Sequence, residues 1–200
     1  MAAARQVLID EGVAGVKVRR IAQRLGVTRG GFYWRFSGPA GLLDELLENW
    51  RATNAASSLA AIRSEGTPAE RFGRLLFAWI DEERFDPKYD MAVREWARTS
   101  RKADLAVRRY DDELVDALAQ LFVDASYDRD ESLIRARIVY YHQIGYYALR
   151  VKQTRVNRYQ VAHLYLRILT GFPGEQFAAL KEAIRQVSSR RSATRPAADD

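Results

Sequence analysis

The 200-residue sequence contains no cysteine. This absence excludes disulfide bonds, thiol nucleophiles and thiolate metal sites, and it is consistent with a reducing compartment. The sequence also has no uninterrupted apolar run of eighteen residues, the shortest that typically spans a membrane. Its first twenty residues lack the charged segment, apolar core and cleavage site of a secretory signal. We therefore expect a cytoplasmic protein that has no membrane partner.

Acidic residues are missing from one long stretch of the chain. Between Gly12 and Leu43 there is no Asp or Glu, although the whole chain has 26 of them. The basic residues of this stretch are Lys17, Arg19, Arg20, Arg24, Arg29 and Arg35. Their summed charge equals the formal net charge of the chain, which is +6. Such a contiguous basic segment is typical of a surface that follows phosphates; the alternative is a basic face that contacts only solvent.

Proline is scarce in the first eighty residues, where only Pro39 and Pro68 occur. Apolar residues recur at spacings of three and four, and no two strand-like runs flank a tight turn, so the sequence predicts an all-α fold. The pattern predicts helices over residues 3–11, 18–25, 28–36, about 40–62, 68–86, 88–100, 103–123, 130–152, 157–170 and 174–187. The Ser-, Arg- and Ala-rich tail, residues 188–200, is expected to be disordered.

Two short helices around Gly26-Val27-Thr28 form a helix-turn-helix pattern. The first helix is expected to pack through Ile21, Ala22 and Leu25, while Arg19 and Arg20 face a DNA backbone. The second helix would present its amino-terminal end to base edges, where Arg29 can make a bidentate contact with guanine. The residues predicted to bind DNA are Lys17, Arg19, Thr28, Arg29, Gly30, Gly31, Tyr33, Trp34 and Arg35.

Gly30 and Gly31 are unusual inside a short helix, where each costs on the order of 1 kcal/mol relative to Ala. Close approach of the backbone to DNA would explain them; the alternative is an irregular turn, with the helix starting at Phe32. Tyr33 and Trp34 are suited to phosphate contacts that position the module without reading sequence. The alternative is that these two rings cover the small core.

Residues 18–47 read VRRIAQRLGVTRGGFYWRFSGPAGLLDELL and resemble the DNA-binding signature of the TetR family. The matching elements are Ile21-Ala22, Leu25-Gly26-Val27, Phe32-Tyr33, Phe36 and Leu42-Leu43. The resemblance covers about residues 3–50. It implies a repressor with two amino-terminal modules that read a palindromic operator and that release it when a small ligand binds the larger carboxy-terminal helical domain. It also implies that Thr28 and Tyr33 contact phosphate and that Arg29 and Gly31 approach bases.

Two positions depart from the family pattern. Lys17 occupies the position where a Thr or Ser usually caps the second helix. Pro39 occupies the position where a Lys usually contacts phosphate at the start of the fourth helix. The chain also begins almost inside its first predicted helix, without the basic arm of many relatives. These departures bear on operator affinity. With the resemblance, we predict three parts: a three-helix DNA-binding module (1–48), a helical ligand-binding and dimerisation domain (49–187) and the disordered tail (188–200).

The predicted helix over 130–152 is apolar or aromatic nearly all round, so it must bury more than one face. One face is expected to belong to a second copy of the chain, in a four-helix dimer interface that the resemblance also implies. The alternative is a central helix buried wholly within one domain. The residues predicted for the dimer interface are Ile138, Tyr141, Gly145, Leu149, Val161, Tyr165 and Ile168.

The effector pocket is predicted from aromatic and adaptable side chains that would surround a central cavity. They are Trp79, Met91, Trp96, Tyr110, Tyr141 and His142, each of which could instead be plain core. His142 and His163 lack the spacing of a helical metal site, and no nucleophile elbow lies near them, so we expect no metal, no cofactor and no catalytic residue.

Taken together, the sequence predicts a homodimeric regulator that binds double-stranded DNA and a small-molecule effector and is not an enzyme. Two other classes stay open. A helical enzyme with a fortuitously basic amino terminus would need ionisable groups clustered in a cleft, whereas the carboxylates here are scattered over predicted helix surfaces. A protein–protein adaptor would show no salt-dependent retention on DNA.

Overall fold

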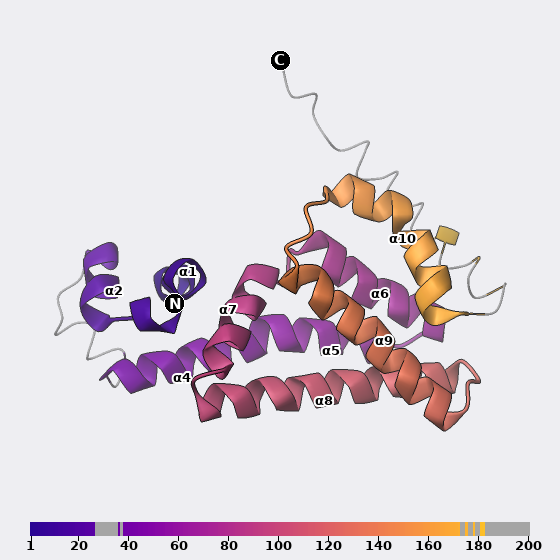
Figure 1. The fold of residues 1–200 in the computed structure, drawn as a ribbon, viewed down its shortest axis with the longest axis horizontal. Helices are drawn as coiled ribbons and strands as arrows, with labels where there is room; N and C mark the ends of the chain where they lie inside the picture. The colour runs from indigo at the N-terminus through magenta and orange to yellow at the C-terminus, as the bar shows by residue number, and fades with distance from the viewer. Residues whose placement is uncertain (27–35, 37, 173–174, 176–177, 179–180, 183–200) are drawn as a thin grey trace, which may run out of the picture. The chain divides into compact units, whose positions relative to one another are not determined.

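A computed structural model describes residues 1–26, 36, 38–172, 175, 178 and 181–182. Its elements are α1 (Ala2–Glu11), η1 (Val13–Gly15), α2 (Val18–Leu25), α4 (Gly38–Trp50), η2 (Arg51–Ala55), α5 (Ala56–Ile62), α6 (Pro68–Asp81), α7 (Pro87–Ala97), α8 (Arg101–Asp124), α9 (Arg129–Ala148) and α10 (Arg155–Thr170). The described residues contain no strand (Figure 1), so the predicted all-α class is confirmed. The predicted tail and most of the helix expected over 174–187 lie outside these residues.

The chain forms two compact units. Unit 1 consists of Met1–Ser57 and Glu82–Glu113, and unit 2 consists of Ser58–Asp81 and Leu114–Asp200. The predicted domain boundary after residue 48 falls within α4, inside unit 1. The compact units therefore do not follow the predicted functional division, because α7 and the first half of α8 pack with the amino-terminal helices.

Unit 1 is built around α1, which contacts both α2 and α7 (Figure 1). Ala4, Val7 and Leu8 of α1 are buried, as the predicted apolar face requires. The helix α2 ends at Gly26, whose φ of 64° lies in the left-handed region that favours glycine. At its other end Lys17 occupies the N-cap position and makes no side-chain cap hydrogen bond, as its side chain has no acceptor.

The long helix predicted to run to Ile62 is continuous but not uniform. Between α4 and α5 the five residues of η2 form a wider, π-helical turn. Within this turn the buried Asn54 donates through Nδ2 to the carbonyl oxygen of Asp86, at 2.7 Å. Its Oδ1 accepts from the backbone N–H of Asp86, at 3.3 Å. The wide turn thus coincides with the side chain that fixes the start of α7.

Asp86 and Pro87 begin a helix instead of ending one. We predicted that α6 would continue to this pair, but it ends at Asp81, and α7 begins at Pro87. Oδ1 of Asp86 accepts from the backbone N–H groups of Lys88 and Tyr89, at 2.9 and 3.3 Å. An acidic N-cap followed by proline at the first helical position is a start signal, so the earlier prediction was wrong at this boundary.

Unit 2 brings α10 against both α6 and α9 (Figure 1). The ring of Phe172 packs on those of Phe72 and Phe122, with centroid distances of 6.0 and 5.8 Å. The buried hydroxyl of Tyr147 on α9 donates to the carbonyl oxygen of Trp79 on α6, at 2.9 Å. These contacts hold α6, α9 and α10 together around the pocket described below.

The start of α6 forms a capping box. Thr67 Oγ1 accepts from the backbone N–H of Glu70 at 3.3 Å, and Glu70 Oε2 accepts from the backbone N–H of Thr67 at 2.9 Å. Hydrogen bonds donated to Oε2 by the backbone N–H and the hydroxyl of Thr67 lower the pKa of the Glu70 carboxyl. We expect Thr67→Ala to lower the free energy of unfolding by about 1 kcal/mol, and Thr67→Ser to change it by less than half as much. Equal stability of both variants in urea denaturation would contradict this role.

Candidate functional site

The basic stretch begins on an amphipathic helix. In α2 the side chains of Val18, Ile21 and Ala22 are buried. Lys17 and Arg19, two of the residues predicted to bind DNA, are exposed. Because the apolar face is turned inward, the cationic groups are left where a phosphate backbone could reach them.

Two other arginines of α2 are engaged within the module. Arg20 forms an ion pair with Glu11 of α1, and Arg24 lies 3.7 Å from the same carboxylate. We predicted that Arg20 would face DNA beside Arg19; its side chain is 51% exposed beside this ion pair, and the DNA contact stays a prediction. Glu11 directly precedes the acid-free stretch, so this carboxylate is the nearest acid available to both arginines.

Leu25 does not pack as predicted. Its side chain is 48% exposed, whereas Ile21 and Ala22 are buried. Leu25 is the last residue of α2, directly before the left-handed Gly26, so it lies at the end of the helix. The other residues predicted to bind DNA lie outside the described residues; they are Thr28, Arg29, Gly30, Gly31, Tyr33, Trp34 and Arg35.

An apolar face extends over α9 and α10 in unit 2. Ile134, Ile138 and Tyr141 follow at helical spacing on α9 and are 52%, 51% and 61% exposed. Gly145 lies one turn further along the same face and is partly exposed. The exposed apolar residues of α10 are Leu164, Tyr165 and Ile168. We call these residues, together with Leu149 and Val161, the α9/α10 apolar face.

Of the residues predicted for the dimer interface, Ile138, Tyr141, Tyr165 and Ile168 are exposed on α9 and α10. Val161 is only partly exposed and lines the pocket described below, and Leu149 lies just past the end of α9 and is 79% exposed. The interface itself stays a prediction. The helix was predicted to reach residue 152 but ends at Ala148. Ile134 was missed by the sequence reasoning. Its spacing of four residues from Ile138 was the signal that would have found it.

A pocket lies between α6, α9 and α10, with walls that are mostly aromatic and aliphatic. The part of it that the centre of a water molecule can reach is about 50 Å³. Its lining residues are Phe72, Leu76, Trp79, Ile80, Val139, His142, Gln143, Tyr146, Gln153, Arg158, Val161, Ala162, Tyr165, Leu166 and Leu169. All of them belong to unit 2.

Two of the residues predicted for an effector pocket, Trp79 and His142, line this one. Tyr141 is exposed on the α9/α10 apolar face instead. The other three, Met91, Trp96 and Tyr110, lie in unit 1. There Tyr110 packs edge-on against the buried ring of Trp50, with a centroid distance of 5.5 Å.

Three polar groups of the pocket set its electrostatics. The guanidinium of Arg158 stacks on the ring of Tyr146, with Cζ 4.8 Å from the ring centroid, and Arg158 is 8% exposed. The amide nitrogen of Gln143 is buried and has no hydrogen-bond partner among the described residues. Desolvation lowers the pKa of His142, so its imidazole is mostly neutral at pH 7.

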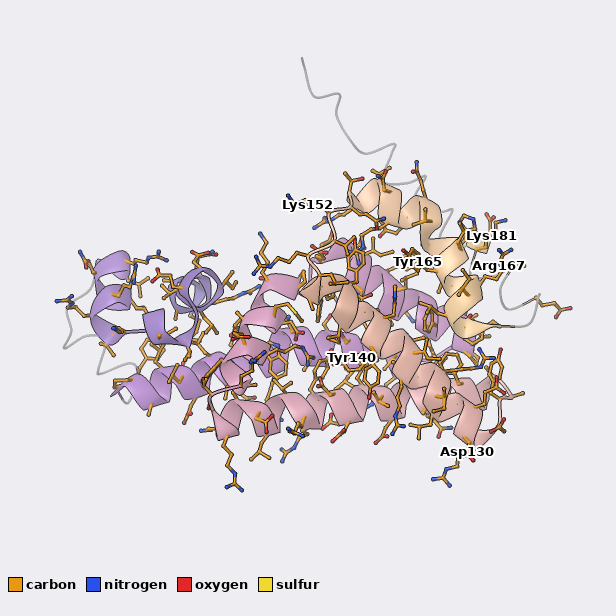
Figure 2. The ribbon with its side chains drawn as sticks, in the orientation of Figure 1. Asp130, Tyr140, Lys152, Tyr165, Arg167 and Lys181 are labelled. Carbon is orange, nitrogen blue, oxygen red and sulfur yellow. The ribbon has the colours of Figure 1, made fainter. Side chains whose placement is uncertain are left out.

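Figure 2 shows Tyr165 on α10; its ring centroid lies 5.2 Å from that of the His142 imidazole on α9. Both side chains are partly exposed, so this pair forms one edge of the pocket. Over the described residues, we find no group of three His, Asp or Glu side chains that could hold a metal ion. None of the helices described is both long and apolar enough to cross a membrane.

The amino-terminal segment matches known proteins in sequence. Residues 1–46 match the model of the family described as bacterial regulatory proteins, tetR family. The chain is 40% identical over 57 residues to the tetracycline repressor protein class A from transposon 1721 of Escherichia coli. It is 40% identical over 55 residues to the tetracycline repressor protein class C of the same organism. These segments cover 28% of this chain and 26% and 25% of the two repressors, about a quarter of their length.

Solved structures resemble the chain over most of its length. A candidate transcriptional regulator from Pseudomonas aeruginosa PAO1 is 18% identical, with a TM-score of 0.61, and the match covers 88% of this chain and 89% of that one. AmtR of Mycobacterium smegmatis is also 18% identical, with a TM-score of 0.59 and coverage of 98% and 93%. At this identity the likeness establishes the fold alone, an all-helical chain with an amino-terminal helix-turn-helix module.

Proposed function

We propose that this chain is a TetR-family transcription regulator that binds operator DNA as a homodimer; its residues 1–46 match the model of that family. The observation that carries the proposal is the match of residues 1–46 to the family, because this segment includes the acid-free stretch from Gly12 to Leu43. The cationic surface supplies affinity for phosphates, and a helix-turn-helix supplies contact with base edges.

The roles of the individual residues follow from their chemistry. Lys17 and Arg19 are exposed beside the buried face of α2, where contacts to phosphate would fix the register of the module. Arg29 is proposed to read a guanine, Thr28 and Tyr33 to bind phosphate, and Gly31 to allow close approach to bases. The module over residues 1–48 would then act as the DNA-binding domain, and residues 49–187 would serve dimerisation and effector binding.

The α9/α10 apolar face supports the homodimer. A cluster of exposed Ile, Tyr and Leu side chains on two neighbouring helices is more apolar than an ordinary protein surface and fits burial against a second copy. Two modules held roughly 34–36 Å apart would read half-sites about one helical turn apart, which predicts a palindromic operator.

The pocket between α6, α9 and α10 is the proposed effector site. Its described lining includes no Ser or Thr nucleophile and no carboxylate, and its walls are mostly aromatic and aliphatic, as is usual for a binding pocket. We infer that effector binding releases the DNA, so that the regulator acts as a repressor in the cytoplasm. No observation favours the adaptor or the enzyme over this function.

Selection of bound sites from random duplex DNA by the purified full chain tests the proposal. We expect a palindromic site, and we expect the logarithm of the affinity to fall linearly with the logarithm of salt concentration, with a slope of about −0.9 for each phosphate contacted. Folded protein that ignores duplex DNA even at low ionic strength would overturn the proposal. Binding to all duplexes alike at low salt would support only the electrostatic attraction to phosphates and would contradict the reading of base edges.

Variants separate reading from positioning. Arg29→Ala is expected to weaken the free energy of binding to the preferred site by about 1–3 kcal/mol. It should also relax the sequence preference at one base pair of each half-site. Tyr33→Phe should weaken all duplexes alike, by about 1 kcal/mol. Arg98→Ala, which removes a side chain that is 77% exposed on the segment after α7, is the control for lost charge. An unchanged preference in the Arg29 variant would refute its role.

A further inference from the structure

The pocket in unit 2 contains an unsatisfied hydrogen-bond donor. Gln143 is 8% exposed, and its Nε2 has no partner among the described residues. A buried donor without an acceptor costs about 1–3 kcal/mol, so such groups are rare in folded proteins unless something else binds them. Gln143 lines the pocket, where a ligand could supply the missing acceptor.

A cation lies in the same pocket. Arg158 lines it, is buried, and is held by stacking on the ring of Tyr146. A guanidinium carries five N–H donors in a planar fork whose geometry matches a carboxylate. His142 is the other ionisable base of the lining, and because desolvation lowers its pKa, Arg158 is the main positive charge there at pH 7.

The remaining walls accept an apolar body. They combine the rings of Phe72, Trp79 and Tyr165 with aliphatic side chains of α6, α9 and α10. Among the described lining residues none is acidic, so nothing in the lining repels an anion. The arrangement therefore provides a polar end at Arg158 and Gln143 and an apolar enclosure around it.

We propose that this pocket binds a small organic monocarboxylate with an aromatic or aliphatic body, its carboxylate accepting hydrogen bonds from Arg158 and Gln143. The inference rests on the proposed function, because it names the chemical class of the effector. The space within the pocket that the centre of a water molecule can reach is about 50 Å³, below the roughly 300–1,000 Å³ of ligand sites. We therefore expect binding to displace side chains, and the exposed pair His142 and Tyr165 is where a ligand would enter.

Calorimetry with the full-length protein in the absence of DNA tests the proposal with three pairs of probes: benzoate and benzamide, phenylacetate and phenylacetamide, octanoate and octanamide. Within a pair the body is the same and only the charge differs. We expect at least one acid to bind ten or more times more tightly than its amide, a difference of about 1.4 kcal/mol. Tryptophan fluorescence should change on binding, because Trp79 lines the pocket. Equal binding of acid and amide, or no binding of any acid at millimolar concentration, would overturn the proposal.

Variants locate the site. Arg158→Gln is expected to weaken the acid at least tenfold and the amide less than threefold, whereas Gln143→Leu should weaken both. Arg155→Gln is the matched control, since Arg155 is exposed at the start of the same helix and does not line the pocket. An acid affinity that falls as far in the control as in Arg158→Gln would contradict the assignment. If Arg158→Gln fails to fold, the comparison of each acid with its amide in the parent protein still decides the proposal.

The outcome is separable from that of the proposed function. Retention on selected duplex DNA without binding of any acid would overturn the carboxylate site and leave the regulator intact. Selective acid binding by a protein that ignores DNA would support the site and overturn the regulator. If the full proposal holds, the acid that binds should also lower the affinity for DNA, and Arg158→Gln should lose this response while it still binds DNA.

Discussion

Replacement of Asp90 by Ala is expected to lower the free energy of unfolding by about 3–5 kcal/mol. Asp90 on α7 is fully buried. Its Oδ1 accepts from the indole N–H of Trp50 at 2.9 Å, and its Oδ2 accepts from Nε of Arg94 at 2.7 Å. Removing the carboxylate would leave the buried Trp50 donor without this acceptor and Arg94 without one of its two acidic neighbours.

The network continues beyond this pair. Arg94 also donates from Nη1 and Nη2 to the two carboxylate oxygens of Asp111, at 3.1 and 2.9 Å. Asp90→Asn keeps an acceptor for Trp50 but loses the charge. We therefore expect its free energy of unfolding to lie between those of the parent protein and the Ala variant. Urea denaturation at pH 7 measures all three.

A control for this prediction lies on the same helix. Glu95 and Arg98 are about three-quarters exposed and lie 3.9 Å apart. Surface pairs contribute about 0–1 kcal/mol, so Glu95→Ala should be nearly neutral. Comparable stability of the Glu95 and Asp90 variants would show that the buried network contributes little.

The second large effect concerns oligomeric state. Ile138→Glu and Ile168→Glu, alone and combined, are expected to turn a dimer into a monomer at micromolar concentration. Ile138 is 51% and Ile168 73% exposed on the α9/α10 apolar face. In a two-fold interface each substitution acts twice, and each would desolvate an unpaired carboxylate. We expect the dimer dissociation constant to rise at least about a thousandfold, equivalent to about 4 kcal/mol.

Sedimentation velocity with the full chain measures this change. Leu105→Glu is the matched control, because Leu105 is an apolar residue of α8 that is 56% exposed and lies outside the α9/α10 apolar face. A dimer that persists in the double variant, or that dissociates equally in the control, would place the interface elsewhere. A monomer should also bind the selected palindrome far more weakly, because only one half-site is then held.

The sequence predicted elements well where the pattern was strong and local. The inward residues Val107, Leu114 and Leu118 of α8 recur at helical spacing and are buried as expected. The capping box at Thr67 involves side chains only three residues apart, so a short stretch of sequence contains the whole signal. These features do not depend on the rest of the fold.

Predictions failed where a residue's role depends on distant partners. Asp86-Pro87 can follow one helix or start the next, and the contact with Asn54, 32 residues away, was invisible in the sequence. The ion pair of Arg20 with Glu11 was likewise not predicted, because Glu11 belongs to a different helix. The π-helical turn of η2 has no comparable local pattern, since its residues also suit an ordinary helix.

The pocket was predicted from aromatic side chains, and this criterion missed its polar end. Arg158 stands three, four and seven residues before Val161, Ala162 and Tyr165, all of which line the pocket. A basic residue on an apolar helical face was therefore a readable signal. The packing of helices that are far apart in sequence decides which aromatic residues share a cavity. The sequence alone therefore did not indicate that Trp96 and Tyr110 lie in unit 1, away from this pocket.

The division of the chain into units has a consequence for protein engineering. Arg5 forms an ion pair with Asp86, and its guanidinium lies over the ring of Tyr89, 4.7 Å from the centroid. The Tyr89 hydroxyl donates to the carbonyl oxygen of Leu46, at 2.7 Å. A fragment cut after residue 57 would lose both neighbours and expose the apolar surface beneath them. A DNA-binding module that is moved into another protein would therefore need residues 82–113 as well. A circularly permuted gene is one way to supply them.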